Sequence, residues 1–436
     1  MRLRDVHVST GVRSCRFGRM LIAIGAVLGT SLPVQGQWVQ WGGPDRNFSV
    51  QTEGLAQTWP VEGPKVLWRR PLGTGYSGIV VDDGKLFTMF RKKRKDPYEY
   101  TIALDAATGE TLWQKRNMAV IPRGVADHGK EFTGPNATPL IVGDRLYTLG
   151  RNAALYCRQV ADGKVVWKHE LKRKFHAQLE TCGYSCSPIA CGQAIIVPVG
   201  NGEGGKNDGS ALVSFRQTTG EELWRKLSFQ INHSSPILIT YDGESQYVLC
   251  TTTGVIGVKP ESGELLWEQP VPEEQFKGVF ATPVWNGRDT LYCASREYGF
   301  GIRLTKRDGK MISEQLWSNR RTPLGMGTPV LVGDLLVGSK RGTQGLEAPM
   351  IGVDLQTGER LWHKRVFPTS ALIDAGGRLI ILDHLGKLGL ATATREGLTV
   401  HSQFQLTEKW SFTAPSIVGT KLYVRDEKDI LALDLG

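Results

Sequence analysis

The stretch ALDAATGETLW, residues 103–113, decides the fold because its pattern returns along the chain. It contains an apolar run, Asp105, a short turn with Gly109, and a second run that ends in Trp113. Glycine supplies the positive φ of a tight turn, while Asp and Thr side chains bond nearby backbone groups. The stretch therefore predicts a strand, a turn and a second strand. A glycine followed four residues later by Trp occurs at Gly109/Trp113, Gly163/Trp167, Gly220/Trp224, Gly263/Trp267 and Gly358/Trp362.

The tryptophans of this pattern recur with the period of a repeat protein. With Trp317 included, successive intervals are 54, 57, 43, 50 and 45 residues, which is the length of one four-stranded propeller blade. We expect these side chains to pack where neighbouring blades meet, because core packing requires the same spacing in every repeat. A substrate-binding aromatic set is the alternative interpretation. The predicted structural tryptophans are Trp68, Trp113, Trp167, Trp224, Trp267, Trp317 and Trp362.

A second signature marks the start of each unit, where a small or hydroxyl residue precedes proline. Because proline has no N–H, it suits the innermost strand of a blade, which is a sheet edge. The proline intervals are 49, 48, 47, 46 and 86 residues, so the last interval conceals one copy, which we place at Ser370-Ala371. Gly78-Ile79 supplies the first copy. The others are Thr138-Pro139, Ser187-Pro188, Ser235-Pro236, Thr282-Pro283, Thr328-Pro329 and Ala414-Pro415.

These starts predict eight blades, with first strands near residues 79, 139, 188, 236, 283, 329, 371 and 415. The segment Ile430–Gly436 is the front half of the signature, and its missing half occurs at Glu62–Trp68. An N-terminal strand would therefore complete the last blade and close the ring. The sequence predicts an all-β fold, an eight-bladed β-propeller with four-stranded antiparallel blades, in a single domain from residue 37 to 436. Two copies are degenerate, at Gly309 and Gly397.

Residues 1–36 have the pattern of a signal peptide. Five arginines precede the apolar run Leu21–Gly29, and small residues follow it around Gly36. We expect Sec-dependent export to the periplasm or the extracellular space, with cleavage near Gly36 and no transmembrane segment afterwards. An uncleaved anchor is the alternative. Cys15 precedes the apolar run, so the sequence predicts no lipid-attachment cysteine at its end.

Charge and cysteine content limit the classes of partner. The formal net charge of +10 falls to +6 without residues 1–36, which hold five Arg and Asp5. For an exported basic monomer we expect an envelope protein or an anionic ligand as partner, and no nucleic acid. The alternative interpretation of the positive charge is a solvated basic surface without a partner. No paired CxxC or histidine pattern accompanies the cysteines, so no metal is expected. Six of them remain, compatible with disulfides without requiring them: Cys157, Cys182, Cys186, Cys191, Cys250 and Cys293.

Loop lengths distinguish the two faces of the predicted ring. The four strands of a blade, A to D, alternate in direction, so the A–B and C–D turns form one face and the remaining connections form the other. The first, the short-turn face, carries brief glycine turns; the second, the long-loop face, carries nearly all insertions, including residues 91–97, 114–134, 169–181, 201–208 and 318–325. We expect any ligand to meet the long-loop face.

The long-loop face holds the candidate site residues. Tyr184 and His233 lie nearest to first strands, so we expect them at the mouth of the channel. No spacing forms a catalytic triad, a zincin motif or a phosphate loop, so no catalytic residue is assigned. The candidates for contact with a ligand or partner are Arg123, His128, His176, Tyr184, His233, Arg296 and Arg320.

The Ala-x-Asp-x-x-Thr-Gly-x-x-x-Trp pattern of residues 103–113 resembles the pyrroloquinoline quinone (PQQ) repeat. The segment WVQWGGPDR, residues 38–46, also resembles the opening of exported propellers of this group. The chain from residue 37 onward is therefore similar to PQQ-binding-like β-propellers. This resemblance implies one of two roles, since the family includes quinoprotein dehydrogenases and the BamB-type propeller lipoprotein of outer-membrane barrel assembly.

The two branches imply different chemistry. Quinoprotein dehydrogenases hold PQQ and Ca²⁺ on the propeller axis, with the quinone between a Trp and a disulfide of adjacent cysteines; this sequence has no adjacent Cys pair. The BamB type carries a lipid-attachment cysteine, which the sequence also lacks at the expected place. We expect an exported, non-catalytic propeller without a cofactor that binds partners through the long-loop face, as in envelope protein assembly. The alternative is a PQQ-dependent dehydrogenase of alcohols or sugars.

Overall fold

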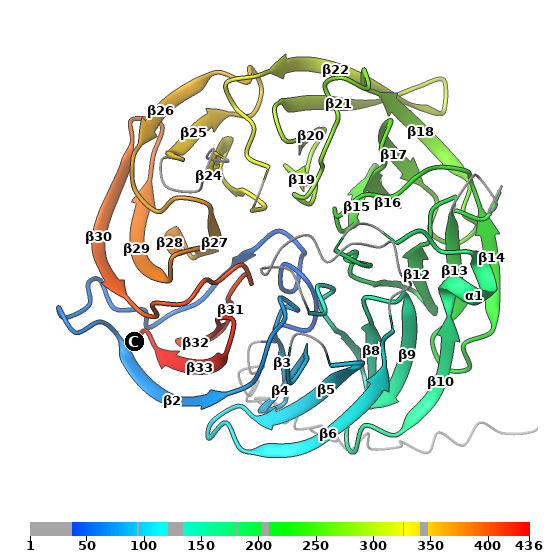
Figure 1. Ribbon diagram of the computed structural model, residues 1–436. Coiled ribbons are helices and arrows are strands. Elements are labelled where there is room, and N and C mark those ends of the chain that lie inside the picture. The colour runs from blue at the N-terminus through cyan, green and yellow to red at the C-terminus, as the bar shows by residue number, and fades with distance from the viewer. Residues whose placement is uncertain are drawn as a thin grey trace, which may run out of the picture. The chain divides into compact units, whose positions relative to one another are not determined.

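The computed structural model describes residues 37–93, 96–120, 134–179, 182–201, 209–325, 327–340 and 348–436. These ranges form eight antiparallel sheets of four propeller strands each, arranged as a ring (Figure 1). The predicted eight-bladed all-β propeller is therefore confirmed. The predicted signal peptide, residues 1–36, lies outside the described residues.

The first half of the ring consists of four blades, each built from four consecutive strands. Blade 1 contains β3 (Val80–Asp82), β4 (Lys85–Phe90), β5 (Tyr98–Asp105) and β6 (Thr111–Met118). Blade 2 contains β7 (Leu140–Val142), β8 (Arg145–Leu149), β9 (Ala154–Gln159) and β10 (Val165–Glu170). Blade 3 contains β11 (Ile189–Cys191), β12 (Ala194–Pro198), β13 (Leu212–Arg216) and β14 (Glu222–Lys226). Blade 4 contains β15 (Ile237–Tyr241), β16 (Glu244–Cys250), β17 (Gly254–Val258) and β18 (Leu265–Pro270).

The second half of the ring includes the two blades that the N-terminal part of the chain joins. Blade 5 contains β19 (Val284–Trp285), β20 (Thr290–Ala294), β21 (Gly299–Arg307) and β22 (Lys310–Asn319). Blade 6 contains β23 (Val330–Val332), β24 (Leu335–Ser339), β25 (Met350–Asp354) and β26 (Arg360–Lys364). Blade 7 contains β1 (Ser49–Val50), β27 (Ser370–Ala375), β28 (Arg378–Asp383), β29 (Lys387–Ala393) and β30 (Leu398–Gln405). Blade 8 contains β31 (Ser416–Val418), β32 (Lys421–Arg425), β33 (Asp429–Asp434) and β2 (Lys65–Pro71).

Ring closure follows the predicted scheme. Strand β2 pairs antiparallel with β33 in blade 8, and Trp68 lies opposite Ala432. The divided copy of the repeat is thus rejoined from two ends of the sequence, as predicted. This pairing covers the outer edge of β33, which would otherwise be an open sheet edge.

The glycine of each regular repeat lies against the tryptophan of the preceding blade. A Cβ atom added at Gly163 would lie 2.7 Å from the ring of Trp113, and one at Gly220 would lie 2.6 Å from that of Trp167. The indole N–H then donates to a carbonyl in the same neighbouring turn, as from Trp167 to Gln217 at 2.8 Å. Glycine is therefore required twice, for its positive φ and for the absence of a side chain.

The interface between blades 4 and 5 departs from this rule. The β21–β22 hairpin extends past the usual turn, and a Cβ at Gly309 would have open space around it. Trp267 consequently donates its indole N–H to the side-chain oxygen of Gln246 in its own blade, at 2.7 Å.

In several blades, the residue before the inner-strand proline connects adjacent blades. The backbone N–H of Thr138 donates to the hydroxyl of Ser187, and that of Ser187 donates to the hydroxyl of Ser235, each at 3.0 Å. The N–H of Thr282 donates in the same way to Thr328 at 3.1 Å. The hydroxyl of the Ser/Thr-Pro signature thus satisfies a buried backbone donor of the preceding blade.

The segment from Trp38 to Val50 lies inside the ring. Trp38 exchanges two backbone hydrogen bonds of 2.9 Å with Val81 in blade 1, while β1 pairs in parallel with β27 in blade 7. Only blade 8 lies between blades 1 and 7, but between these two pairings Arg46 donates to the carbonyls of Pro188 and Pro236, beside the inner strands of blades 3 and 4. The segment therefore reaches across the axis, as the dark blue ribbon in Figure 1 shows. The sequence did not predict this crossing.

Candidate functional site

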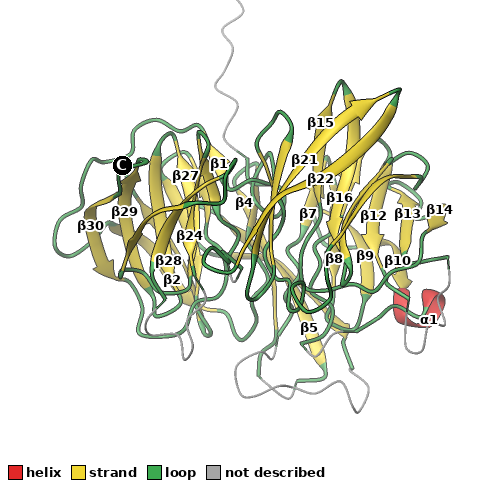
Figure 2. Cartoon of the chain, turned by 90° about the horizontal axis from the view of Figure 1, so that it is seen from above, coloured by secondary structure: helices red, strands yellow, loops and turns green. Residues whose placement is uncertain are grey.

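The ring presents two different faces, which Figure 2 shows from the side. The β15 hairpin and β1 lie toward the upper side, which is the short-turn face. The single described helix, α1 (Leu171–Phe175), lies on the lower side, which is the long-loop face.

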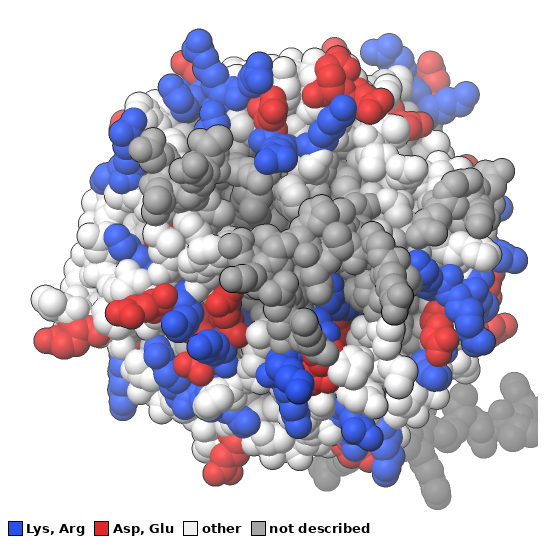
Figure 3. Space-filling view, viewed as in Figure 1, with Lys and Arg blue, Asp and Glu red and all other residues white. Residues whose placement is uncertain are grey.

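The corner around α1 is a basic part of the long-loop face. Leu171 and Phe175 are buried and anchor the helix, while Lys172, Arg173 and Lys174 form its charged side. Arg173 pairs with Glu170 at 3.2 Å and Lys174 with Glu222 at 3.5 Å, so two carboxylates lie among these cations. Figure 3 shows Lys and Arg side chains gathered around the rim of this face, including the neighbourhood of α1.

Two shallow depressions flank this corner. One, of about 370 Å³, is lined by residues 168–170, 173 and 174; the other, of about 440 Å³, includes the candidate residue His176. His176 ends α1 in the left-handed conformation and is exposed. Both depressions therefore offer cationic side chains to a ligand.

His169, beside α1, is half-buried and packs against the core with one side of its ring. Its ring stacks on Phe215 with centroids 4.4 Å apart, and its Nε2 lies 2.7 Å from the carbonyl of Gly220. Burial lowers the pKa of His169, so the ring is neutral at neutral pH and donates to that carbonyl.

Tyr184, predicted at the channel mouth, is fully buried. Its hydroxyl donates to the carbonyl of Pro198, and burial raises its pKa well above the usual value. A phenol without exposed surface cannot contact a ligand in this conformation.

His233 is held among the inner connections of three blades. Its ring stacks parallel to Phe280 with centroids 5.1 Å apart, and its Nδ1 lies 3.0 Å from the hydroxyl oxygen of Ser185. Burial lowers the pKa of His233 to about 4. A neutral, weakly basic imidazole is poorly suited to general-base catalysis near neutral pH, although the Ser–His distance would permit a proton transfer.

The remaining candidates do not form one described cluster. Arg296 and Arg320 are exposed in loops of blade 5, where Arg320 pairs with Glu297 at 3.0 Å. His176 belongs to the connection between blades 2 and 3. Arg123 and His128 lie outside the described residues.

A buried carboxyl group between blades 1 and 2 escaped the sequence analysis. Glu99 is 1% exposed, and its Oε2 accepts from the backbone N–H of Arg151 at 3.2 Å. Burial raises its pKa to about 7, against the opposing effects of Arg151 and Arg91. The sequence did contain a sign of this burial. Glu99 lies between Tyr98 and Tyr100 in a strand, and because successive side chains of a strand point to opposite faces, Glu99 points inward.

The axis is occupied by the chain itself. The guanidinium of Arg46 donates to the carbonyls of Pro188 and Pro236, at 2.6 and 3.3 Å, and to the side chain of Gln40 at 2.9 Å. Burial lowers the pKa of Arg46 to about 9. These bonds satisfy inner-strand carbonyls that would otherwise face the channel.

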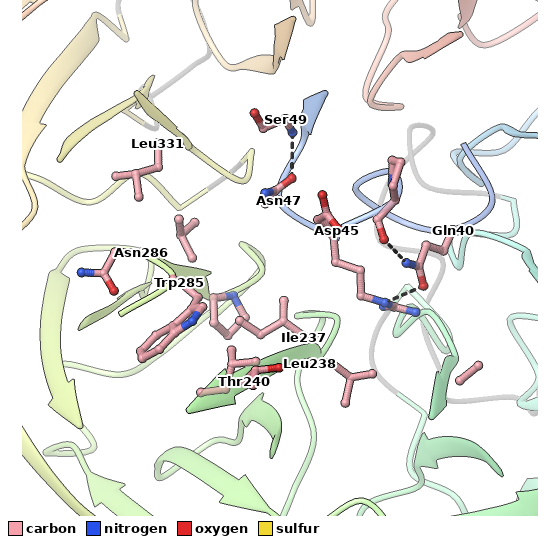
Figure 4. Close-up of a pocket in the computed structure, with 17 residues that line it drawn as sticks. Gln40, Asp45, Asn47, Ser49, Ile237, Leu238, Thr240, Trp285, Asn286 and Leu331 are labelled. Carbon is pink, nitrogen blue, oxygen red and sulfur yellow. Dashed lines mark hydrogen bonds between the residues drawn. The ribbon is translucent and has the colours of Figure 1, made fainter. Parts of the chain in front are cut away.

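A cavity of about 590 Å³ opens beside this segment on the short-turn face (Figure 4). Its walls come from residues 44–47 and 49 and from the inner strands of blades 3 to 6, including Leu238, Trp285 and Leu331. The sequence analysis expected ligands on the opposite face and gave no indication of this cavity. Its lining combines the segment Trp38–Val50 with the inner strands of blades 3 to 6. These residues lie far apart in the sequence, so no local pattern predicts that they meet.

A PQQ–calcium centre needs a group of oxygen ligands around its ion. Among the residues that the structure describes, no three His, Cys, Asp or Glu side chains are grouped as metal ligands require. Cys157, Cys191, Cys250 and Cys293 are free thiols. The described residues therefore do not fit a PQQ–calcium centre, and no catalytic step is derived through one.

A family model described as outer membrane protein assembly factor BamB matches residues 98–364, more than half of the chain. The chain belongs to this family. No curated protein sequence matches it. No described helix of this BamB-family chain is long and apolar enough to cross a membrane.

Solved structures share the fold of this BamB-family chain at low sequence identity. BamB from Moraxella catarrhalis has a TM-score of 0.57 and 14% identity, and the match covers 85% of this chain and 99% of that protein. Quinohemoprotein alcohol dehydrogenase from Comamonas testosteroni has a TM-score of 0.66 and 12% identity, covering 92% and 80%. Sqt1 from Saccharomyces cerevisiae has a TM-score of 0.52 and 10% identity, covering 85% and 99%. An assembly factor and an enzyme share this fold, so the fold alone does not distinguish between these two functions.

Proposed function

We propose that this chain is an exported, non-catalytic binding module that holds an anionic segment of a cell-envelope protein at the α1 corner. The observation that carries the proposal is the basic side of α1, with its two flanking depressions on the long-loop face. The family description, an outer membrane protein assembly factor, supports an envelope setting.

The α1 corner has the properties of an electrostatic docking surface. Its helix is fixed by two buried apolar side chains, so the cations of residues 172–174 are held in a constant arrangement. Lys168 adds a further cation at the same place. The cations outnumber the carboxylates Glu170 and Glu222 with which they pair, and such an excess of one sign raises the association rate of oppositely charged partners and makes binding sensitive to salt.

The state of the titratable candidates supports a non-catalytic role. His233 is neutral and only weakly basic, and the hydroxyl of Tyr184 is buried and has no access to solvent. The axis, where a dehydrogenase of this fold would hold its quinone, contains Arg46 and its neighbours.

Charge reversal at the α1 corner tests the binding role. The variant Arg173→Glu/Lys174→Glu should bind labelled poly-glutamate at least about fivefold more weakly at low salt, because two attractive contacts become repulsive. The matched control is Arg307→Glu/Lys310→Glu, which makes the same charge change at exposed positions of the β21–β22 turn on the other face. Equal weakening in both variants would reduce the effect to net charge and refute the α1 site.

Two further measurements separate the binding module from the enzyme. A pull-down from envelope extract should retain a partner with the wild type and the control, but not with the α1 variant. Addition of PQQ and Ca²⁺ should produce neither stoichiometric binding nor dye-linked oxidation of alcohols or sugars. Such oxidation would replace the proposal by the dehydrogenase alternative.

A further inference from the structure

The N-terminal segment completes the inner edges of some blades on the short-turn face. Trp38 pairs with Val81 in blade 1, and the N–H of Ile141 in blade 2 donates to Val39 at 2.8 Å. In blade 7, β1 adds to β27, with Asp374 donating to Phe48 at 2.9 Å. Extended chain added to an inner strand is therefore a binding mode that this molecule already uses.

The cavity on the short-turn face lies along the part of the ring that this segment leaves uncovered. Its inner strands are β11, β15, β19 and β23. Strand β15 has five residues, whereas β11 and β23 have three each and β19 has two. The longest inner strand, β27 with six residues, is the one that β1 covers. Strand β15 is thus the longest inner edge that borders the cavity.

The backbone of β15 turns bonding groups toward the cavity. The carbonyl of Pro236 points to the axis, since it accepts from Arg46. In an antiparallel pair, alternate residues direct both N–H and C=O away from the partner strand. Leu238 and Thr240 therefore present these groups to the cavity that they line. Within the described part of the chain, no hydrogen bond occupies them.

The side chains around this edge suit an apolar peptide with a cationic residue. Leu238, Trp285 and Leu331 are half-buried in the lining, and Asp45 contributes an exposed carboxylate (Figure 4). Proline and charged side chains usually protect long edges, but Leu238 and Thr240 provide neither.

We propose that the cavity binds an extended segment of a second polypeptide, which adds as a strand to the inner edge of β15. Alternate apolar side chains of that segment pack against Trp285 and Leu238, and a basic residue meets Asp45. The backbone bonds supply affinity and the lining supplies selectivity, as in other strand-addition complexes. This site is independent of the α1 corner, because it lies on the opposite face.

The test uses the whole protein and the capped peptide acetyl-Lys-Val-Thr-Val-Thr-Val-amide. Its control carries N-methyl groups on alternate backbone nitrogens, which removes the donors of one peptide edge and keeps every side chain. We expect the unmodified peptide to bind about tenfold more tightly than the control, because the control loses edge hydrogen bonds. It should also slow amide hydrogen exchange at Leu238 and Thr240.

Variants place the interaction on β15. Thr240→Pro removes an N–H that faces the cavity and leaves the β15–β16 pairing intact, so peptide binding should weaken about tenfold. Trp285→Ala should weaken it as well, while Arg173→Glu/Lys174→Glu should not change it. Equal affinity for both peptides, protection confined to the long-loop face, or no binding would each overturn the proposal. These results do not depend on poly-glutamate binding at α1.

Discussion

The interface between blades 2 and 3 and that between blades 4 and 5 solve the same packing problem differently. In the first, Trp167 lies under Gly220 and donates to the backbone carbonyl of Gln217. In the second, the long β21–β22 hairpin of blade 5 carries its turn away from Trp267, which donates to the side chain of Gln246 instead. The difference shows that the tryptophan is retained where its usual partner turn is absent, provided that the indole N–H finds an acceptor.

The largest expected effect separates the two roles of the repeat glycine. Gly220 and Gly309 both have φ of 74°, so alanine costs each about 1 kcal/mol through backbone strain. Gly220→Ala also forces a methyl group onto Trp167, for a total of about 3–4 kcal/mol. Thermal and urea unfolding should therefore show a much greater loss for Gly220→Ala than for Gly309→Ala. Equal losses would mean that contact with the tryptophan is unimportant.

A buried charge extends the comparison to the interface of blades 1 and 2. The pKa of Glu99 is raised from an ordinary 4.5 to about 7, so the folded state binds the proton more tightly than the unfolded state. The stabilisation is fully present below pH 4.5 and is lost as pH rises to 7. Relative to Glu99→Gln, the wild type should lose about 2–3 kcal/mol across this window.

Unfolding free energies of the two proteins, measured at several pH values, test this expectation. The control variant is Asp162→Asn, because that carboxyl is exposed in a turn and its pKa is lowered by Lys164. Parallel stability curves for the wild type and Glu99→Gln would contradict the assigned role of burial.

The smallest expected effect concerns the substitute acceptor. Gln246→Leu leaves the indole N–H of Trp267 buried without its partner, at a cost of about 1–2 kcal/mol. Gln217→Leu is the matched control: it removes side-chain bonds to the carbonyls of Gly192 and Ala194, but the acceptor for Trp167 is a backbone carbonyl that survives the substitution. Its cost should stay below about 1 kcal/mol. A greater loss for Gln217→Leu in chemical unfolding would reverse the comparison.

Local repetition explains why the sequence predicted so much of the fold. The start of each first strand is determined by residues that are close in sequence. The Ser/Thr-Pro and Gly-to-Trp patterns therefore located the eight first strands within about one residue of their observed positions. The closure by β2 was predictable because the divided repeat keeps its pattern at Trp68. The predicted export and partner, by contrast, stay predictions.

The site was less accessible to sequence reasoning because its residues meet over long separations. Arg46 has no repeat around it, and its partners Pro188 and Pro236 lie 142 and 190 residues away. Tyr184 and His233 precede the first strands β11 and β15, but Tyr184 is buried and His233 is half-buried by neighbouring connections, which no local pattern encodes. Glu99 was missed because its importance comes from Arg151 in the next blade.

The closure of blade 8 also imposes an order in time. Strand β2 is synthesised long before its partner β33, since 364 residues separate the paired Trp68 and Ala432, so β2 stays unpaired while blades 1 to 7 are made. Blades 1 to 6 can each pair their own strands as they appear, whereas the final blade depends on a contact of very high sequence separation, which is slow to form. A truncation within Asp429–Asp434 should therefore leave the early blades formed, with β2 unpaired and prone to associate with other chains.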